Sequence, residues 1–343
     1  MKRFQAHLLP AVAIAALLAT AGQAWAAEKL RISLDTNPSH VRNQATQLFI
    51  DELKKRAPDK FDIEVYPSAQ LFRDRDVARA LRQGGVEMAI PGIWQLDGLE
   101  PNMAMPTLPV FYGLSEDVTL KVMDGKVGQE INKRTEDKLR VKILGPWMNL
   151  GFQHMYSVSK PIQNHEDLKG MKIRYPGGTA NAERIKVFGA TPTLIPWPDV
   201  PLALSSSTVD GVSTTHESAS SAKLWESGLK HAFEDRQYFG QYVPMVSQAF
   251  WAKLSPDLQK AMVDSWNAII GKQREMAAAA QKEARHEMEK NGMKVATATD
   301  QALRQWREKL MAVQDQIVSD MKIDADLVKL AVAEVRKLDA PGQ

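Results

Sequence analysis

The sequence predicts an α/β protein of two lobes, with mainly parallel sheets flanked by helices and a long helix near the C-terminus that spans both lobes. Strand-type and helix-type segments alternate along the chain, which is typical of sheets covered by helices on both faces. The chain has 343 residues, 44% hydrophobic and 25% charged, so it is long enough for two domains. One helical pattern, residues 255–292, would extend about 50 Å and exceed the width of one small domain.

The first 26 residues differ from the rest of the chain. Lys2 and Arg3 precede an apolar run over residues 8–21, and Ala24-Trp25-Ala26 has the small-x-small pattern of a cleavage site. The apolar run is too short for a membrane span and ends at that pattern. These residues therefore predict a secretory signal peptide cleaved near Ala26, and an exported mature protein.

Composition excludes several classes of protein. The chain contains no cysteine, which excludes a disulfide scaffold, thiolate metal sites and cysteine catalysis. Without the signal peptide the net charge is +1, so no basic surface for nucleic acid is expected. No other apolar run approaches the roughly 20 residues of a transmembrane helix, and direct membrane insertion is not expected.

No catalytic or metal-binding motif occurs. The motifs G-x-S-x-G, H-E-x-x-H and G-x-x-x-x-G-K-[ST] are absent, and no histidines have the spacing of metal ligands. An exported hydrolase is the enzyme alternative, for which Ser213, His216 and Asp210 would have to form a triad. Three residues crowded into one turn rarely point at a common atom. We therefore expect no catalytic residue, no metal and no cofactor.

The N-terminal half repeats a strand–helix unit. Helical spacing ends before Pro58, and glycines follow the second helix at residues 84 and 85. We expect strands at residues 30–37, 61–66 and 86–92, helices at 41–57 and 74–85, an irregular loop at 100–112, a helical region at 115–139 and a strand at 141–149.

The C-terminal half begins with extended residues 151–162 and resumes the same alternation. Ser255 and Pro256 are the preferred cap and first-turn residues of the long helix. We expect a capped helical turn at 164–170, strands at 171–176 and 191–196, helices at 180–189 and 198–207, a strand-like segment at 243–254 and closing helices at 299–321 and 324–338.

This order of elements predicts that the chain crosses between the lobes more than once. We expect one lobe to comprise residues 27–150 plus about 240–278. The other lobe would comprise about 151–239 plus about 279–300, and the helices of about 301–343 would pack across both.

Arg174 is the central candidate for ligand binding. It lies near the end of a predicted strand in GMKIRYPGG (residues 170–178), beside a glycine-rich turn. Its planar guanidinium suits bidentate binding of a carboxylate. A second stretch, residues 202–218, contains a strand ending in small polar side chains, and the two stretches would form facing walls of a site. The alternative is a surface arginine paired with Glu166 or Asp167.

Other candidates follow the strands of the first lobe. Ligands of open α/β sheets bind outside the carboxyl ends of the strands. Asp35 and Asn37 follow the first strand, and Gly92, Trp94 and Gln95 follow the third. Asp35 would accept hydrogen bonds from ligand hydroxyls or cap structure, and Trp94 could equally be a core aromatic.

The chain resembles the solute-binding proteins of TRAP (tripartite ATP-independent periplasmic) transporters, the DctP family. The resemblance covers essentially the whole mature sequence. Its marks are the blocks YPSAQLFRDRDVARALRQGGVEMAI, KPIQNHEDLKGMKIRYPG, FGATPTLIPWPDVPLALSSSTVDGV and FWAKLSPDLQKAM, in this order.

The resemblance implies a periplasmic-binding-protein fold with a ligand cleft between two lobes. It implies closure on an organic acid anion in the periplasm and delivery to the small and large integral membrane subunits of the transporter. A periplasmic sensor subunit that presents its ligand to a receptor would share the same cleft and remains the alternative.

Position by position, the resemblance places the family's carboxylate-binding arginine at Arg174. The aromatic residue of the cleft falls on Trp197, and the polar residue past the V-D-G turn falls on Thr214. The chain departs from the family where many members have a second arginine, here His154. It also departs where some keto-acid binders have a metal-coordinating glutamate, here Ser213.

These departures imply a less cationic, metal-free site. The expected ligand is a monocarboxylate that bears hydroxyl, keto or ring substituents. Asn149, Tyr175 and His216 complete the candidate set, although His216 could simply begin a helix. Protonation of His154 would add positive charge, so we expect anion affinity to rise as the pH falls toward 6.

Overall fold

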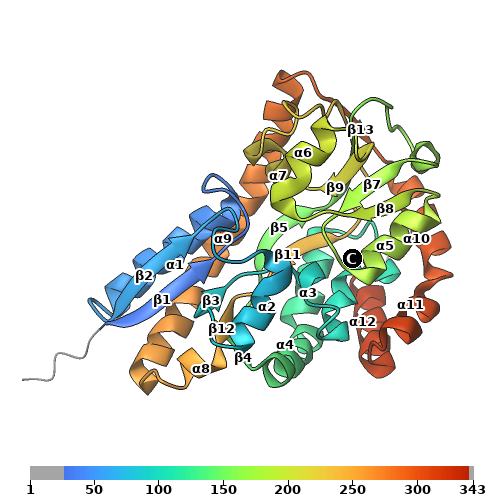
Figure 1. Cartoon of the computed structure of the whole chain (residues 1–343). Helices are drawn as coiled ribbons and strands as arrows, with labels where there is room; N and C mark the ends of the chain where they lie inside the picture. The colour runs from blue at the N-terminus through green and yellow to red at the C-terminus, as the bar shows by residue number, and fades with distance from the viewer. Residues whose placement is uncertain (1–26, 340–343) are drawn as a thin grey trace, which may run out of the picture.

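Two larger sheets form the cores of two lobes, and a two-stranded sheet lies between them (Figure 1). The computed structural model describes residues 27–339. The predicted signal peptide therefore lies outside the described residues.

The first lobe contains a five-stranded sheet in the order β2-β1-β3-β12-β4. Strand β1 pairs in parallel with β2 and β3, whereas β12 runs antiparallel to β3 and β4. The strands are β1 (Glu28–Ser33), β2 (Phe61–Tyr66), β3 (Met88–Ala89), β4 (Val141–Ile143) and β12 (Met245–Ser247).

Helix α1 (Val41–Arg56) shows why the helices of the first lobe form where they do. His40 caps its N-terminus, because the imidazole accepts a hydrogen bond from the Arg42 amide. Phe49 and Leu53 are fully buried in the core that α1 shares with the sheet. The other helices of this part are α2 (Asp74–Arg82), α3 (Glu116–Asp124), α4 (Lys126–Leu139) and α8 (Gln248–Trp251), with 3-10 helices η1 (Ile93–Gln95), η2 (Pro101–Thr107) and η3 (Pro109–Phe111).

The second lobe contains a six-stranded sheet in the order β13-β10-β6-β9-β7-β8. Its strands are β6 (His154–Ser157), β7 (Lys172–Tyr175), β8 (Thr191–Leu194), β9 (Gly211–Thr214), β10 (His231–Glu234) and β13 (Lys294–Thr297). Its helices are α5 (Thr179–Val187), α6 (Val200–Ser205) and α7 (His216–Ser221), with η4 (His165–Leu168) and η5 (Trp197–Asp199).

Helix α9 (Pro256–Lys290) and the sheet of β5 (Met148–Phe152) and β11 (Phe239–Tyr242) connect the lobes. The helix contacts α1 of the first lobe and α7 of the second. Gln273 exchanges two hydrogen bonds with the backbone of Asn149, at 2.8 and 2.7 Å, and Gln281 donates to the Leu150 carbonyl at 2.7 Å. These glutamines hold the connecting strand β5 against α9.

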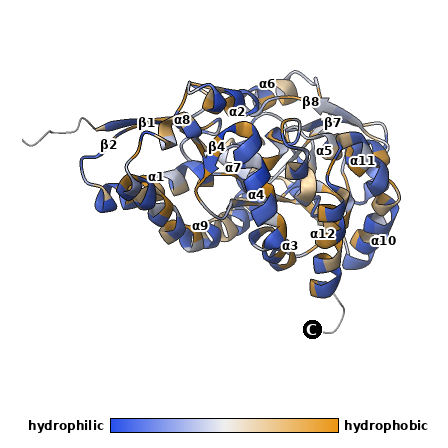
Figure 2. Ribbon diagram, turned by 90° about the horizontal axis from the view of Figure 1, so that it is seen from below, coloured by the Kyte–Doolittle hydropathy of each residue, from blue (hydrophilic) through white to orange (hydrophobic). Residues whose placement is uncertain are grey.

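The C-terminal helices are α10 (Asp300–Met311), α11 (Gln314–Met321) and α12 (Ala325–Leu338). Leu303 and Leu310 of α10 belong to an apolar cluster of the second lobe, whereas Ala331 and Val335 of α12 belong to the core of the first. Figure 2 shows mostly hydrophilic residues on the outer turns of α4. No helix among residues 27–339 is long and apolar enough to cross a membrane.

The structure confirms the α/β, two-lobed fold and the long helix, and it corrects several details. Both larger sheets are mixed rather than mainly parallel, because the chain returns to the first lobe through β12 and enters the second lobe through β6, each antiparallel to its neighbours. Residues 100–112 form 3-10 helices rather than an irregular loop. The segment 243–254 is a short strand followed by α8, and strands β10, β11 and β13 were missed.

Candidate ligand-binding site

A small cavity lies between the lobes at the carboxyl ends of β1 and β7. Its volume is about 30 Å³, room for about two waters, so any larger ligand enters only when the lobes or side chains move. The first lobe and β11 contribute Asp35, Thr36, Asp74, Trp94, Gln95 and Tyr242, the connecting strand contributes Leu150, and the second lobe contributes Gln153, Arg174, Pro176, Trp197, Thr214 and Ser218. An adjoining cavity of about 180 Å³ shares five of these residues and also reaches Arg73, Asp97 and the glycines at 177 and 178.

Arg174 is buried in the wall of this cavity, with 2% of its surface exposed. Its Nε donates to the Ile195 carbonyl at 2.9 Å and its Nη1 to the Ser213 carbonyl at 3.3 Å. The guanidinium carbon lies 5.5 Å from the centre of the Trp197 ring, a cation–π contact. Burial lowers the pKa of Arg174 to about 10, so the side chain remains a cation at neutral pH.

No acidic side chain among residues 27–339 forms an ion pair with Arg174. The surface-pairing alternative is wrong, because Glu166 lies near Lys309 and Asp167 caps η4. A buried cation without a partner is costly unless an anion compensates it. The cavity therefore presents an unneutralised guanidinium.

Strand order explains why Arg174 and Thr214 meet at one wall. Strand β7 lies between β8 and β9, and Arg174 is in register with Thr193 on one side and Val212 on the other. The two stretches expected to face each other are thus neighbours in one sheet. The opposite wall comes from the first lobe.

That opposite wall contains two buried carboxylates, Asp35 and Asp74. Arg42 pairs with both: its Nη2 contacts Asp35, and its Nη1 lies 2.8 Å from Asp74 and 3.0 Å from the Ile90 carbonyl. Burial raises the pKa of Asp74 to about 7, although Arg42 opposes the shift. The guanidinium carbon of Arg42 also lies 4.4 Å from the centre of the Tyr242 ring.

The two walls therefore differ in chemistry. The second-lobe wall offers the charged donors of Arg174, and the first-lobe wall offers carboxylate oxygens that accept hydrogen bonds. A molecule held between them would have an anionic end toward Arg174 and hydrogen-bond donors toward Asp35 and Asp74. A second anionic group on the first-lobe side would meet these carboxylates.

Six of the predicted site residues line the cavity: Arg174, Trp197, Thr214, Gln95, Trp94 and Asp35. His154 and His216 instead line a separate cavity of about 390 Å³, together with Glu234 and Arg236. His154 Nδ1 accepts from the Arg236 amide at 3.2 Å, and burial holds the pKa of His154 well below its usual 6.5. This lowered pKa opposes the protonation of His154 on which the expected rise in anion affinity depends, and that pH dependence stays a prediction.

The other five predicted residues do not line the cavity. Asn37 donates to the Ser221 carbonyl at 3.0 Å, and Asn149 donates to Glu116 at 2.9 Å. Gly92 forms an isolated backbone β-bridge with Tyr242, and the Ser213 carbonyl accepts a hydrogen bond from Arg174. Tyr175 is half-buried and is not among the lining residues.

The sequence analysis did not identify several residues that line the cavity, nor Arg42, the buried cation that pairs with Asp35 and Asp74. Arg42 lies on the buried face of α1 with Ala45 and Phe49, at a spacing of three and seven residues. A charged residue on an apolar helix face is a usable signal for a buried ion pair. The missed lining residues had no such signal: Thr36, Asp74, Leu150, Gln153, Pro176, Ser218 and Tyr242.

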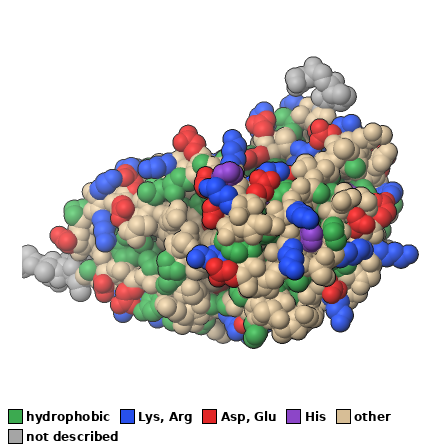
Figure 3. Space-filling model, turned by 90° about the horizontal axis from the view of Figure 1, so that it is seen from above, with side chains coloured by type: hydrophobic (Ala, Val, Ile, Leu, Met, Phe, Trp, Pro, Cys, Tyr) green, Lys and Arg blue, Asp and Glu red, His purple; other side chains and the backbone are tan. Residues whose placement is uncertain are grey.

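The described residues offer no obvious metal centre. No group of three or more His, Cys, Asp or Glu side chains within 27–339 is placed to hold a metal ion. Figure 3 shows basic and acidic side chains interspersed over one face of the molecule, without a large region of one sign.

Comparisons with known proteins place the chain in a family. The family model described as bacterial extracellular solute-binding protein, family 7 (DctP), matches residues 32–320. The 2,3-diketo-L-gulonate-binding periplasmic protein YiaO of Escherichia coli is 29% identical over 95% of this chain and 98% of its own length.

Solved structures share the fold. The sugar-acid-binding protein DctPAm of Advenella mimigardefordensis, in complex with galactonate, has a TM-score of 0.85 at 19% identity and covers 91% of this chain and 98% of its own. A TRAP periplasmic solute-binding protein from Sulfurospirillum deleyianum with bound succinate has a TM-score of 0.82 at 24% identity, covering 90% and 99%. By the match of its family model, this chain belongs to the DctP family, family 7 of the bacterial extracellular solute-binding proteins.

Proposed function

We propose that the chain binds an organic acid between its lobes and that Arg174 holds the carboxylate. The observation that supports this most is the buried guanidinium of Arg174, which has no acidic partner among residues 27–339. A ligand carboxylate would neutralise it through charge-assisted hydrogen bonds. Trp197 would pack against the ligand, and Thr214 and Gln95 would contact its polar groups.

The preferred ligand is a monocarboxylate rich in hydroxyl groups. Asp35 and Asp74 face Arg174 from the first lobe and would accept hydrogen bonds from ligand hydroxyls. A dicarboxylate would bring its second charge toward these two acids. Two relatives support this preference, because their names state that they bind 2,3-diketo-L-gulonate and a sugar acid. The succinate-bound structure represents the alternative ligand class, the dicarboxylates.

The proposed role of the acid-bound protein is delivery to the small and large membrane subunits of a TRAP transporter, without catalysis. The location would be the periplasm, after removal of residues 1–26. We also propose the lobe boundaries: 27–150 plus about 240–278 for the first lobe, and about 151–239 plus about 279–300 for the second. The distribution of the two larger sheets supports this division.

A thermal-shift panel tests the ligand class. The mature protein is heated with galactonate, galacturonate, orotate or succinate, and with neutral galactose as a control. A ligand that binds only the native state raises the melting temperature by mass action. We expect the sugar acids to give the largest shifts and galactose none. Shifts with galactose alone would contradict acid binding, and succinate exceeding galactonate would contradict the hydroxyl preference.

A further inference from the structure

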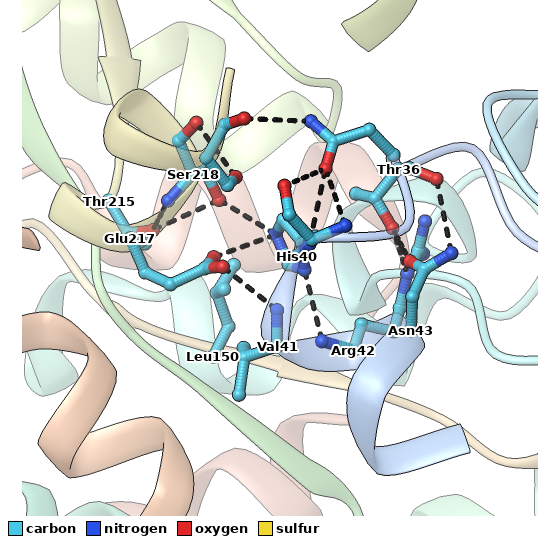
Figure 4. A network of polar contacts seen from close by, with 12 residues as sticks. Thr36, His40, Val41, Arg42, Asn43, Leu150, Thr215, Glu217 and Ser218 are labelled. Atoms are coloured by element: carbon cyan, nitrogen blue, oxygen red, sulfur yellow. Dashed lines mark hydrogen bonds and ion pairs between the residues drawn. The ribbon is translucent and has the colours of Figure 1, made fainter. Parts of the chain in front are cut away.

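The N-terminus of α1, in the first lobe, receives a carboxylate from the second lobe. Glu217 Oε1 accepts a hydrogen bond from the Val41 amide at 2.8 Å, and Glu217 Oε2 lies 3.0 Å from His40 Nε2 (Figure 4). His40 Nε2 is also 3.0 Å from Ser218 Oγ, whereas its Nδ1 accepts from the Arg42 amide. The side chains of His40 and Glu217 are at least 94% buried at this contact.

The N-terminus of α5, in the second lobe, receives a carboxylate from the first lobe. Asp97 Oδ2 accepts from the Thr179 amide at 2.8 Å, and Asp97 is 8% exposed. Two glycines with φ of 142° and 89°, Gly177 and Gly178, allow this approach. A Cβ on Gly177 would lie 3.0 Å from the Trp94 carbonyl oxygen, so a side chain there would push the segments apart.

The two contacts are reciprocal. Neither α1 nor α5 has an acidic residue in its own first turn, and α5 has no side-chain cap of its own. The first amides of a helix lack intrahelical partners and carry a partial positive charge, so a carboxylate there is stabilising. Each helix therefore obtains from the opposite lobe a carboxylate that its own first turn lacks.

Both contacts depend on the relative position of the lobes. Glu217 belongs to α7 and Val41 to α1, 176 residues apart, and Asp97 and Thr179 are 82 residues apart. Separation of the lobes would return these amides and carboxylates to water. Both contacts therefore join the two lobes in the arrangement of this structure.

We propose that Glu217 and Asp97 are positioning residues that latch the two lobes together and populate the closed arrangement of the unliganded protein. The latch favours closure without itself holding the ligand carboxylate, which is the proposed role of Arg174. The proposed latch depends on closure of the cleft between the lobes, and it does not depend on the identity of the ligand.

Spin-label distances test the latch without any ligand, so failure of the latch is distinguishable from failure of acid binding. The chain has no cysteine, which permits specific labelling of Arg79→Cys on α2 and Ser205→Cys on α6, both exposed. Interspin distances are measured in this labelled parent and in Glu217→Ala, Asp97→Ala, Glu217→Gln and Asp97→Asn variants. Glu183→Ala is the matched control, because Glu183 is on α5 but pairs with Lys186 of the same helix and not across the lobes within residues 27–339.

We expect each alanine variant to lower the ratio of closed to open molecules by about two- to thirty-fold, the range for a charge at a helix terminus. The Gln and Asn variants keep an acceptor oxygen but lose the charge, so their closed populations should lie between those of the alanine variants and the parent, and Glu183→Ala should match the parent. A stability defect alone would shift the melting temperature without changing the distances. Identical distributions in the parent and both alanine variants would overturn the proposal.

Hydrogen exchange of the unlabelled parent provides a second measurement that needs no variant. The Val41 and Thr179 amides lie on different lobes, yet both become free when the latch opens. We expect the same opening free energy for both amides after correction for their intrinsic exchange rates. Protection of one amide without the other would contradict a latch that opens as a unit.

Discussion

Replacement of Arg174 by alanine tests the site most directly. In a largely dehydrated cleft the change would leave a ligand carboxylate without its charged partner, a loss on the order of 2 to 5 kcal/mol by analogy with buried charge pairs. Because about 1.4 kcal/mol corresponds to a tenfold change in affinity, the dissociation constant would increase by a factor between about 30 and a few thousand.

The unliganded protein should respond much less. Burial lowers the pKa of Arg174 from 12.5 to about 10, which corresponds to a cost of roughly 3 kcal/mol for the charged form in the folded state. Alanine removes this cost but also removes the hydrogen bonds to the Ile195 and Ser213 carbonyls, each worth about 1.5 to 3 kcal/mol for a charged donor. These opposing contributions nearly offset each other, so the melting temperature without ligand should change by only a few degrees.

Isothermal titration calorimetry with the acid that gives the largest thermal shift measures the effect. Arg174→Lys should recover little affinity, because an ammonium cannot supply two parallel donors. Arg31→Ala is the control, since Arg31 pairs with Glu87 away from the cavity and its loss should leave affinity unchanged. A dissociation constant for Arg174→Ala within twofold of the parent would refute the role of the guanidinium.

Four further changes test other parts of the structure. At pH 8, above the pKa of about 7 that burial gives Asp74, Asp74→Asn removes a buried negative charge opposite Arg174. Calorimetry at this pH should show succinate gaining affinity relative to galactonate, and an unchanged ratio would contradict the charge argument. Trp197→Ala should weaken acid binding about tenfold through loss of packing, with a nearly constant melting temperature because Trp197 is only partly buried; equal binding would place the indole outside the contact. Asp235 is fully buried, and burial raises its pKa from 3.8 to about 8, so the folded state binds more protons and stability should fall as the pH rises from about 4 to 8. Thermal melts of Asp235→Asn should show a smaller slope than the parent, because Asp74 also has a raised pKa and keeps its own contribution; parallel slopes would contradict the assignment. Gly177 has a φ of 142°, and an alanine Cβ there would lie against the Trp94 carbonyl. Gly177→Ala should therefore separate the lobes and increase the radius of gyration measured by small-angle scattering. An unchanged radius would show that the contact tolerates a side chain.

Much of the fold follows from local signals in the sequence. The predicted start of the long helix agrees with α9, because Ser255 and Pro256 supply a cap and a first-turn residue whose effects depend only on their neighbours. The predicted strand around Arg174 agrees with β7, and the capped turn before it agrees with η4, which has a capping box at Asn164. Short polar and glycine signals of this kind act within a few residues.

The pairing of strands could not be predicted in the same way. Strand β12 inserts antiparallel between β3 and β4 after the chain has passed through the second lobe. Its three residues have no pattern that indicates direction or neighbours. The direction depends on where the chain re-enters the first lobe, which is a property of the whole path.

The same distinction between local signals and long-range packing applies to the ligand-binding site. The sequence by itself determined the α/β elements, the long connecting helix and the candidacy of Arg174, because these depend on side-chain type and short-range spacing. Only the tertiary structure decided that Arg174 is buried without an acidic partner among residues 27–339, that Arg42 joins Asp35 to Asp74, and that His154 lies in another cavity. Burial and pairing depend on packing between elements far apart in the chain, and the energy of a charge depends on that packing more than on its neighbours in sequence.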